Sequence, residues 1–236
     1  MDTILRSQGL SKRYGKKQAL NPLDLELRPG RIVGLLGPNG SGKTTFLKLC
    51  AGLLTPTAGS IAICSENVGV NTKALVSYLP DRTYLRNGQK ISQQLDFFQD
   101  FYADFDRERA EQMLRALDVP LNARFGTLSK GSREKVQLVL VMSRRAKLYL
   151  LDEPIGGVDP AARDYILNTI VTNFPPEATV LISTHLIADV EGILDDYIFL
   201  HQGNVVQQGS VQENKEATGL TLDAQFREVF RCLPNC

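Results

Sequence analysis

The 236-residue sequence predicts an α/β fold in which a mostly parallel sheet is preceded by an antiparallel β part and interrupted by a helical part. Short apolar runs at residues 148–151 and 179–183 are typical of strands that are buried on both faces. A helical pattern at 161–171 lies between them, and strand, helix, strand at this spacing indicates parallel pairing. From 91 to 117 the apolar spacing becomes that of amphipathic helices.

The first fifty residues supply the antiparallel part and the first element of the parallel sheet. Apolar and polar residues alternate at 23–27, and Pro29 and Gly30 end this stretch, so small antiparallel strands joined by turns are expected. Residues 31–36 (RIVGLL) form a candidate buried strand, and residues 41–50 a helix.

The segment between 91 and 117 predicts two amphipathic helices. Their apolar residues at helical spacing are Leu95, Phe98, Phe101, Met113, Leu114 and Leu117. Five aromatic residues gather within nine positions of this segment: Phe97, Phe98, Phe101, Tyr102 and Phe105. Some must pack in the helical core, and we expect at least one or two to face a partner, since exposed aromatic residues mark interfaces. Near the C-terminus, Leu222, Phe226, Val229 and Phe230 predict a short helix that packs on the core.

Composition excludes several classes of protein. The net charge of +1 gives no indication of a nucleic-acid partner. The start of the chain lacks the basic and apolar stretches of a secretory signal. No run approaches the roughly 18 apolar residues that a membrane helix needs, so the chain as it stands is expected in the cytosol. The four cysteines have no metal-binding or redox spacing and are expected to be reduced: Cys50, Cys64, Cys232 and Cys236.

A glycine-rich segment between the strand and the helix of the first fifty residues satisfies the pattern GxxxxGK[ST]. Its residues are Gly37, Pro38, Asn39, Gly40, Ser41, Gly42, Lys43, Thr44 and Thr45. Glycines let backbone N–H groups turn onto phosphate oxygens, and a helix N-terminus favours an anion. Lys43 is placed to bridge the β- and γ-phosphates and Thr44 to ligate Mg²⁺. The motif alone leaves open a kinase, a GTPase, a helicase or a transporter ATPase.

Two acids follow the apolar run at 148–151. Asp152 and Glu153 therefore emerge at the carboxyl end of a buried strand, where α/β proteins place their sites. Asp152 is placed to hold Mg²⁺ directly or through water, and Glu153 to polarise the water that attacks the γ-phosphate. Taken alone, such a pair of acids is as often a solvated turn; beside a phosphate-binding loop the catalytic interpretation is favoured.

Further motifs lie in a fixed order around these acids: LSKG at 128–131, LLDEP at 150–154, GVDP at 157–160 and STH at 183–185. Together with the phosphate-binding loop they resemble the ATP-binding cassette (ABC) ATPases over residues 3–212. The resemblance implies a P-loop NTPase core with a mostly parallel sheet, an N-terminal antiparallel β subdomain and a helical subdomain. It implies one nucleotide-binding domain over residues 1–236, with the helical subdomain at about 85–140 inserted in the RecA-like core.

In this family two subunits sandwich two ATP molecules head to tail. The resemblance implies that Ser129 and the backbone N–H of Gly131 reach the γ-phosphate held by the other subunit. Asp159 would lie in the loop that crosses the dimer, although it also suits the cap of a helix that starts at Pro160. His185 would contact the γ-phosphate and hold Glu153 in line.

Three further positions carry expectations from the same resemblance. Tyr14 matches the aromatic residue that stacks on adenine. Asp81 stands where the family usually has a glutamine that senses Mg²⁺ and the attacking water; as a carboxylate it can still ligate the metal, so we expect altered metal dependence with activity retained. Lys130 replaces a glycine of the signature and brings a positive charge near the other subunit's phosphate or the membrane partner, unless it is simply solvated.

The resemblance implies an ATP-hydrolysing subunit with ATP and Mg²⁺ as its ligands. Its partners would be a second copy of the chain and a separate integral membrane permease, which would hold the protein at the cytoplasmic face of the membrane. The short cassette is most similar to bacterial exporter subunits for drugs, lipids or peptides. The alternative is an ABC ATPase that acts on ribosomes or DNA without a permease, although such members usually fuse two cassettes or carry a long coiled coil.

Overall fold

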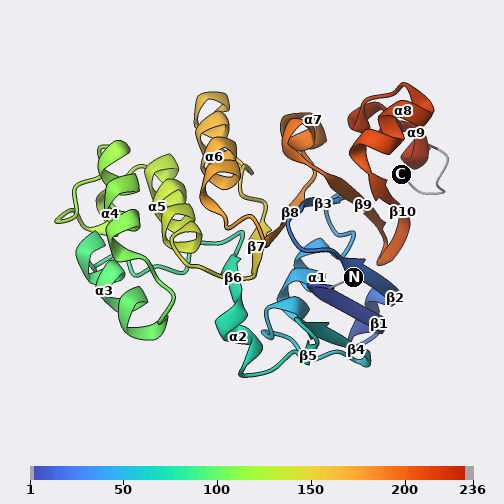
Figure 1. The fold of residues 1–236 in the computed structure, drawn as a ribbon, viewed down its shortest axis with the longest axis horizontal. Helices are drawn as coiled ribbons and strands as arrows, with labels where there is room; N and C mark the ends of the chain where they lie inside the picture. The colour runs from blue at the N-terminus through green and yellow to red at the C-terminus, as the bar shows by residue number, and fades with distance from the viewer. Residues whose placement is uncertain (1–2, 232–236) are drawn as a thin grey trace.

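The computed structural model describes residues 3–231 and contains two sheets flanked by helices (Figure 1). The first sheet is antiparallel, with strand order β2-β1-β4-β5. Its strands are β1 (Leu5–Tyr14), β2 (Lys17–Leu27), β4 (Ala58–Ile63) and β5 (Glu66–Asn67). The second sheet has the order β10-β9-β3-β8-β7-β6 and is parallel except for β10. Its strands are β3 (Ile32–Leu36), β6 (Val76–Leu79), β7 (Leu148–Asp152), β8 (Thr179–Thr184), β9 (Asp196–His201) and β10 (Asn204–Ser210).

Helices cover both sheets and form a separate group at one end (Figure 1). Those of the central region are α1 (Lys43–Cys50), α2 (Thr72–Leu75), α6 (Pro160–Asn173) and α7 (Ile187–Val190), with the 3₁₀ turn η2 (Glu191–Ile193). The group at one end contains α3 (Ile91–Phe101), α4 (Arg107–Ala116), η1 (Phe125–Thr127) and α5 (Lys130–Met142). The last two helices, α8 (Val211–Thr218) and α9 (Leu222–Arg231), lie at the opposite end, beside β9 and β10.

The parallel sheet lies between two cores because its central strands are buried on both faces. In β3, side chains alternate across the sheet: Ile32 and Leu36 join the core under α6 and α9, whereas Val33 and Leu35 join the core formed with the antiparallel sheet and α1. All five residues of β3 are buried. The sequence expectation of an apolar strand here is confirmed, with its start at Ile32 instead of residue 31.

The helical group has its own core, and Arg144 ties that group to the parallel sheet. The Arg144 side chain is 3% exposed. Its guanidinium donates to both carboxylate oxygens of Asp104, at 3.0 and 3.1 Å, and to the backbone carbonyls of Ala74 and Val76, at 2.8 and 2.5 Å. It also lies 3.9 Å from the centre of the Tyr102 ring. One buried cation therefore links the end of α3 to the start of β6.

Most predicted elements are present, and three details differ. The helix expected at 41–50 begins at Lys43, because Gly42 has a φ of 112° that a helix cannot contain. The helix expected at 161–171 is longer and begins at Pro160, with Asp159 as its cap. Phe101 does not join the helical core: it is 69% exposed, because Leu95 and Phe98 lie on the inner face of α3 and Phe101 lies beside Phe97 on the outer face.

The C-terminal part contains the expected helix and one more. In α9, Phe226 and Phe230 pack against Phe199 of β9, and the Glu191 carboxylate accepts a hydrogen bond from the backbone N–H of Leu222 at 2.8 Å. The additional helix α8 follows β10. Cys50 and Cys64 are free thiols, as expected, whereas the expectation for Cys232 and Cys236 concerns residues outside those described.

Candidate functional site

The phosphate-binding loop runs from the end of β3 to the start of α1, and its glycines are required by close backbone approaches. A side chain at Gly37 would meet the Leu200 carbonyl at 2.2 Å, and one at Gly42 would meet the Ala19 carbonyl at 2.7 Å. Gly40 and Gly42 also have positive φ angles, of 83° and 112°, which other residues rarely adopt. The local sequence therefore folds into a turn that brings Lys43 to the first position of α1.

Lys43 is almost fully buried, and its ammonium group points into the site. It lies 2.7 Å from the Gly37 carbonyl, 3.3 Å from the Pro38 carbonyl and 3.4 Å from Glu153 Oε1. Burial lowers the pKa of Lys43 from its ordinary value, and the neighbouring Glu153 carboxylate opposes this change. The result is a cation in a restricted, poorly hydrated position, which strengthens its attraction for a phosphate.

Asp152 ends strand β7 next to the loop. Its Oδ1 accepts hydrogen bonds from Thr44 at 3.0 Å and from Ser183 at 2.6 Å, and the Tyr78 hydroxyl lies 3.5 Å from its Oδ2. Burial raises the pKa of Asp152, the two hydroxyl donors oppose the shift, and the negative charge of Asp81 adds to it. Burial likewise raises the pKa of Tyr78, so its hydroxyl keeps its proton and acts as a donor.

These residues fit a magnesium ion. Within the described part of the chain, no three His, Cys, Asp or Glu side chains are grouped to hold a metal by themselves. Magnesium in nucleotide sites is instead held by one or two oxygen ligands of the protein together with phosphates and water. The Thr44 hydroxyl and Asp152 carboxylate, already hydrogen-bonded to each other, are such a pair. Thr44 also lines one cleft together with Asp81.

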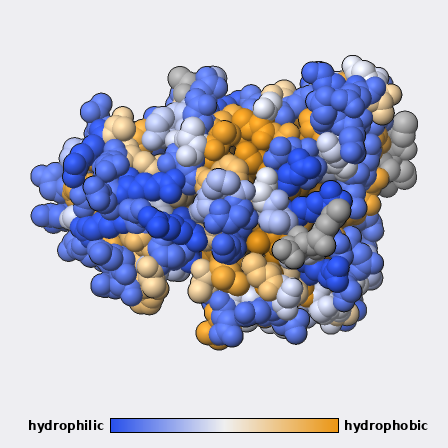
Figure 2. All heavy atoms as spheres, in the orientation of Figure 1, coloured by the Kyte–Doolittle hydropathy of each residue, from blue (hydrophilic) through white to orange (hydrophobic). Residues whose placement is uncertain are grey.

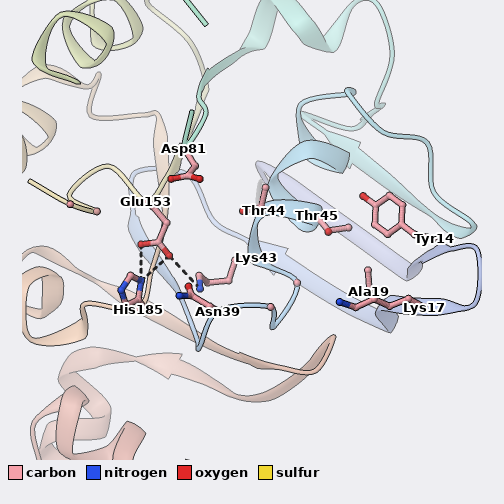
Figure 3. Close-up of a pocket in the computed structure, with 14 residues that line it drawn as sticks. Tyr14, Lys17, Ala19, Asn39, Lys43, Thr44, Thr45, Asp81, Glu153 and His185 are labelled. Carbon is pink, nitrogen blue, oxygen red and sulfur yellow. Dashed lines mark hydrogen bonds and ion pairs between the residues drawn. The ribbon is translucent and has the colours of Figure 1, made fainter. Parts of the chain in front are cut away.

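Glu153 follows Asp152 and is held by three groups. Its carboxylate accepts a hydrogen bond from the Thr184 hydroxyl at 3.1 Å. It also lies 3.1 Å from His185 Nδ1 and forms an ion pair with Lys43 (Figure 3). Because a carboxylate only accepts, His185 Nδ1 carries the hydrogen of this contact. Glu153 has a φ of 51°, a strained value for a residue with a side chain, of the kind that clusters at functional sites.

A cleft of about 600 Å³ is lined by Lys43, Thr44, Asp81, Glu153 and His185, whereas Asp152 is buried and does not line it. Figure 3 shows Tyr14 at one end of it and Glu153 and His185 at the other, with the phosphate-binding loop between them. Tyr14 is 45% exposed, so its ring is open to a ligand. The loop residues that line the cleft are Asn39, Gly40, Gly42, Lys43, Thr44 and Thr45, whereas Gly37, Pro38 and Ser41 do not line it.

Four residues that line the cleft were not predicted as site residues, although Gly157 begins the GVDP motif: Lys17, Ala19, Gly156 and Gly157. The first two come from β2, on the antiparallel sheet, and no motif marks them. The two glycines follow LLDEP along the chain, so their proximity to Glu153 was a readable signal.

Ser129, Gly131 and Asp159 do not line the cleft of their own chain. Ser129 caps α5, where its hydroxyl accepts a hydrogen bond from the backbone N–H of Ser132 at 3.2 Å. Gly131 has open space where a side chain would be. Asp159 caps α6 by accepting from the Ala162 N–H at 3.0 Å, so the capping role expected from sequence is confirmed. Lys130 is exposed, with its ammonium 3.4 Å from the Gly157 carbonyl and 3.8 Å from the Glu134 carboxylate.

Three features define a nucleoside-triphosphate-binding α/β protein: a glycine loop after a central strand, a buried lysine at the start of the following helix, and paired acids at the end of a parallel strand. The family described as "ABC transporter" matches residues 20–156. The SkfA peptide export ATP-binding protein SkfE of Bacillus subtilis (strain 168) is 30% identical over 98% of this chain and 97% of that protein. The daunorubicin resistance ATP-binding protein DrrA3 of Streptomyces coeruleorubidus is 30% identical over 92% of this chain and 72% of its own length.

A solved structure of an ATP-binding subunit of an ABC transporter superposes with a TM-score of 0.85 at 27% identity and covers 96% of this chain and 99% of that one. The chain belongs to the ABC transporter family as an ATP-binding subunit, and it is an ABC transporter ATPase. No helix among residues 3–231 is long and apolar enough to cross a membrane.

Proposed function

We propose that two copies of this chain close around two ATP molecules and drive a separate membrane permease that exports a drug, lipid or peptide. The export direction is supported by relatives whose names include peptide export, daunorubicin resistance and Nod factor export. The protein would act as one nucleotide-binding domain over residues 1–236, with the helical subdomain at about 85–140, held at the cytoplasmic face of the membrane by its permease.

The observation that carries this proposal is the arrangement of Glu153, His185 and Lys43 in one cleft. Lys43 would bind the β- and γ-phosphates, and the Tyr14 ring would stack on adenine at the far end. Thr44, Asp152 and Asp81 would hold Mg²⁺, which neutralises phosphate charge when bound.

In the hydrolysis step, the oxygen of a water molecule forms a bond to the γ-phosphorus while the bond from that phosphorus to the β–γ bridging oxygen breaks. Glu153 takes the proton of the attacking water, and ADP and inorganic phosphate are the products. The hydrogen bonds from Thr184 and His185 fix the carboxylate that does this, so its orientation is set before the reaction.

The dimer would complete each site with residues of the other copy. Ser129 and the Gly131 N–H, at the N-terminus of α5, do not line the cleft of their own chain and would be available to a γ-phosphate bound by a second copy. Lys130 lies beside them with its charge exposed and would add to the attraction for that phosphate. Asp159 lies in the adjoining loop and would contact the opposite site.

A second cleft of about 500 Å³ supports a permease partner. This docking groove lies between the parallel sheet, the end of α1 and the end of α3, and its exposed apolar residues are Leu53, Tyr84 and Phe101. Figure 2 shows a largely hydrophilic surface over α3, α4 and α5 on the face that it draws. Lys48 and Lys73 also line the groove, so a short cytoplasmic helix with apolar and acidic side chains fits it best.

The test is ATP hydrolysis and dimerisation by Glu153→Gln. We expect the variant to lose about 10²–10⁴-fold in kcat, because general-base catalysis contributes that much, and to accumulate as an ATP-bound dimer in size-exclusion chromatography. Glu177→Gln, which removes an exposed carboxylate that pairs with Lys147, serves as the matched control and should behave as wild type. Wild-type protein that neither hydrolyses ATP nor dimerises, even with a membrane partner, would refute the proposal.

A further inference from the structure

Lys17 is a cation that lines the nucleotide cleft and that no sequence motif marks. It opens strand β2 directly opposite Tyr14 of β1 in the antiparallel pairing, so the two side chains are neighbours on one face of the sheet. Figure 3 shows the Lys17 side chain extending past Ala19, with its nitrogen toward the phosphate-binding loop. The ammonium group is therefore directed from the Tyr14 end of the cleft toward the loop.

The charges that line the cleft are unevenly distributed along it. Both acids that line it, Asp81 and Glu153, lie at the end away from Tyr14 (Figure 3). Lys43 forms an ion pair with Glu153 at 3.4 Å, whereas Lys17 has no acidic partner among residues 3–231. At the Tyr14 end, Lys17 thus supplies a positive charge that the described part of the chain does not neutralise, and this end of the cleft suits an anion.

The backbone next to Lys17 touches the start of helix α1. A side chain at Gly42, the residue that caps α1, would meet the Ala19 carbonyl and the Leu20 side chain, both at 2.7 Å. Strand β2 therefore packs directly on the turn whose N–H groups face phosphate oxygens. Lys17 precedes Ala19 by two residues, about 7 Å along an extended strand, and its flexible four-carbon stem covers most of that distance. Its ammonium is thus within reach of a phosphate bound at the N-terminus of α1.

The order of groups along a nucleotide identifies which of them faces Lys17. With adenine at Tyr14 and the γ-phosphate beside Lys43, the α-phosphate is the charged group nearest the base. Ribose hydroxyls and base nitrogens lie near it, but they are neutral acceptors, and a hydrogen bond to a charged oxygen is about twice as strong.

We propose that Lys17 binds the α-phosphate of the nucleotide, so that two lysines share the triphosphate, Lys43 at the β- and γ-phosphates and Lys17 at the α-phosphate. This inference rests on the proposed function, because it takes the direction of the nucleotide from the stacking of adenine on Tyr14. The α-phosphate is common to ATP and ADP and does not change during hydrolysis. A contact with it stabilises substrate, transition state and product equally, so Lys17 raises affinity without accelerating the chemical step and helps to retain ADP after hydrolysis.

The first experiment measures binding of ADP to the full chain by calorimetry in EDTA, so that no metal contributes. For Lys17→Met we expect about tenfold weaker binding, the lower end for a hydrogen bond to a charged group, because Lys17 is exposed. AMP-PNP, a non-hydrolysable analogue of ATP, should lose the same factor. Lys17→Arg keeps the cation and should recover most of the affinity. Lys16→Met removes the neighbouring exposed lysine, which does not line the cleft, and should bind both nucleotides as wild type.

The second experiment separates the α-phosphate from the base and the ribose. GDP changes the base and 2′-deoxy-ADP removes a ribose hydroxyl, and both keep the α-phosphate. Lys17→Met should weaken both by the same factor as ADP, so the ratios of the three affinities should remain those of wild type. In phosphorus NMR spectra of bound ADP, the α-phosphate resonance should differ between wild type and Lys17→Met, and the β-phosphate resonance should not.

The outcomes separate this inference from the proposed function. A Lys17→Met protein that binds ADP as wild type does, or whose α-phosphate resonance is unchanged, overturns the inference. Loss of the preference between ADP and GDP, or between ADP and 2′-deoxy-ADP, would assign Lys17 to the base or the ribose and overturn it as well. An equal loss of affinity in Lys16→Met would show that only the general charge of the hairpin matters. Wild-type protein that binds neither ADP nor AMP-PNP refutes the proposed function itself.

Discussion

Replacing Arg144 with methionine should destabilise the protein by about 3 kcal/mol, because it removes a buried cation and leaves its partners behind. The variant keeps most of the side-chain volume and loses every donor. Breaking a buried ion pair from one side costs about 3–5 kcal/mol, and we take the low end because Asp104 is 27% exposed and can turn to water. The Val76 carbonyl cannot do so, and an unpaired buried carbonyl costs about 1–3 kcal/mol of that total.

The assay is equilibrium urea unfolding followed by circular dichroism, with thermal unfolding as a second measure. For a chain of this size each kcal/mol corresponds to about 2–4 °C, so Tm should fall by about 6–12 °C. Arg145→Met is the matched control: the neighbouring arginine is 70% exposed and pairs with Asp106 at 3.0 Å, and such surface pairs contribute at most about 1 kcal/mol. If the two variants unfold within 1 kcal/mol of each other, Arg144 does not tie the helical group to the sheet as described.

Three further predictions concern the site and its surroundings. Tyr14→Ala should raise KM for ATP about tenfold with kcat unchanged, since stacking on a base contributes about 1–3 kcal/mol. Tyr14→Phe keeps the ring and should match wild type in steady-state assays. An equal rise of KM in both variants would exclude stacking. Ser129→Ala should abolish the ATP-dependent dimer in size-exclusion chromatography while ATP binding to the monomer persists, whereas Ser210→Ala, which removes the cap of α8, should leave the dimer intact. Glu134→Gln should raise the free energy of unfolding at pH 7, because burial raises the pKa of Glu134 and the folded protein therefore disfavours its ionised form. In urea titrations this gain should vanish below about pH 4, where the carboxyl group is protonated in the folded and unfolded states alike. A gain that persists in acid would point to another cause.

The sequence predicted the loop and three of the six strands of the second sheet, β3, β7 and β8, because these depend on local patterns. Uninterrupted apolar runs indicate strands covered on both faces, and the glycine loop carries its own geometry. Strands β4, β5, β6, β9 and β10 were not predicted. Of these, β10 is polar and half-exposed, so it lacks the alternation that marks a strand. β10 forms because its backbone pairs with β9. Such a pairing is not visible in a local sequence pattern.

Burial of individual polar residues was also beyond the sequence. Arg144 and Arg145 are adjacent and chemically identical, yet one is 3% and the other 70% exposed, because only Arg144 points at Asp104 and the Val76 carbonyl. For the same reason Tyr78 gave no signal as a neighbour of Asp152. Its position depends on the register between β6 and β7, which brings together residues that lie far apart in the chain.

The position of β3 in the sheet also determines when the site can form during synthesis. β3 (Ile32–Leu36) pairs only with β8 and β9, residues 179–201, which the ribosome adds roughly 7 to 30 seconds later at ordinary elongation rates. Until then the phosphate-binding loop has no strand on either side, and the Leu200 carbonyl that closes against Gly37 has not been made. A nascent chain that ends before β8 therefore carries the complete glycine motif without the strands that flank β3 in the folded protein.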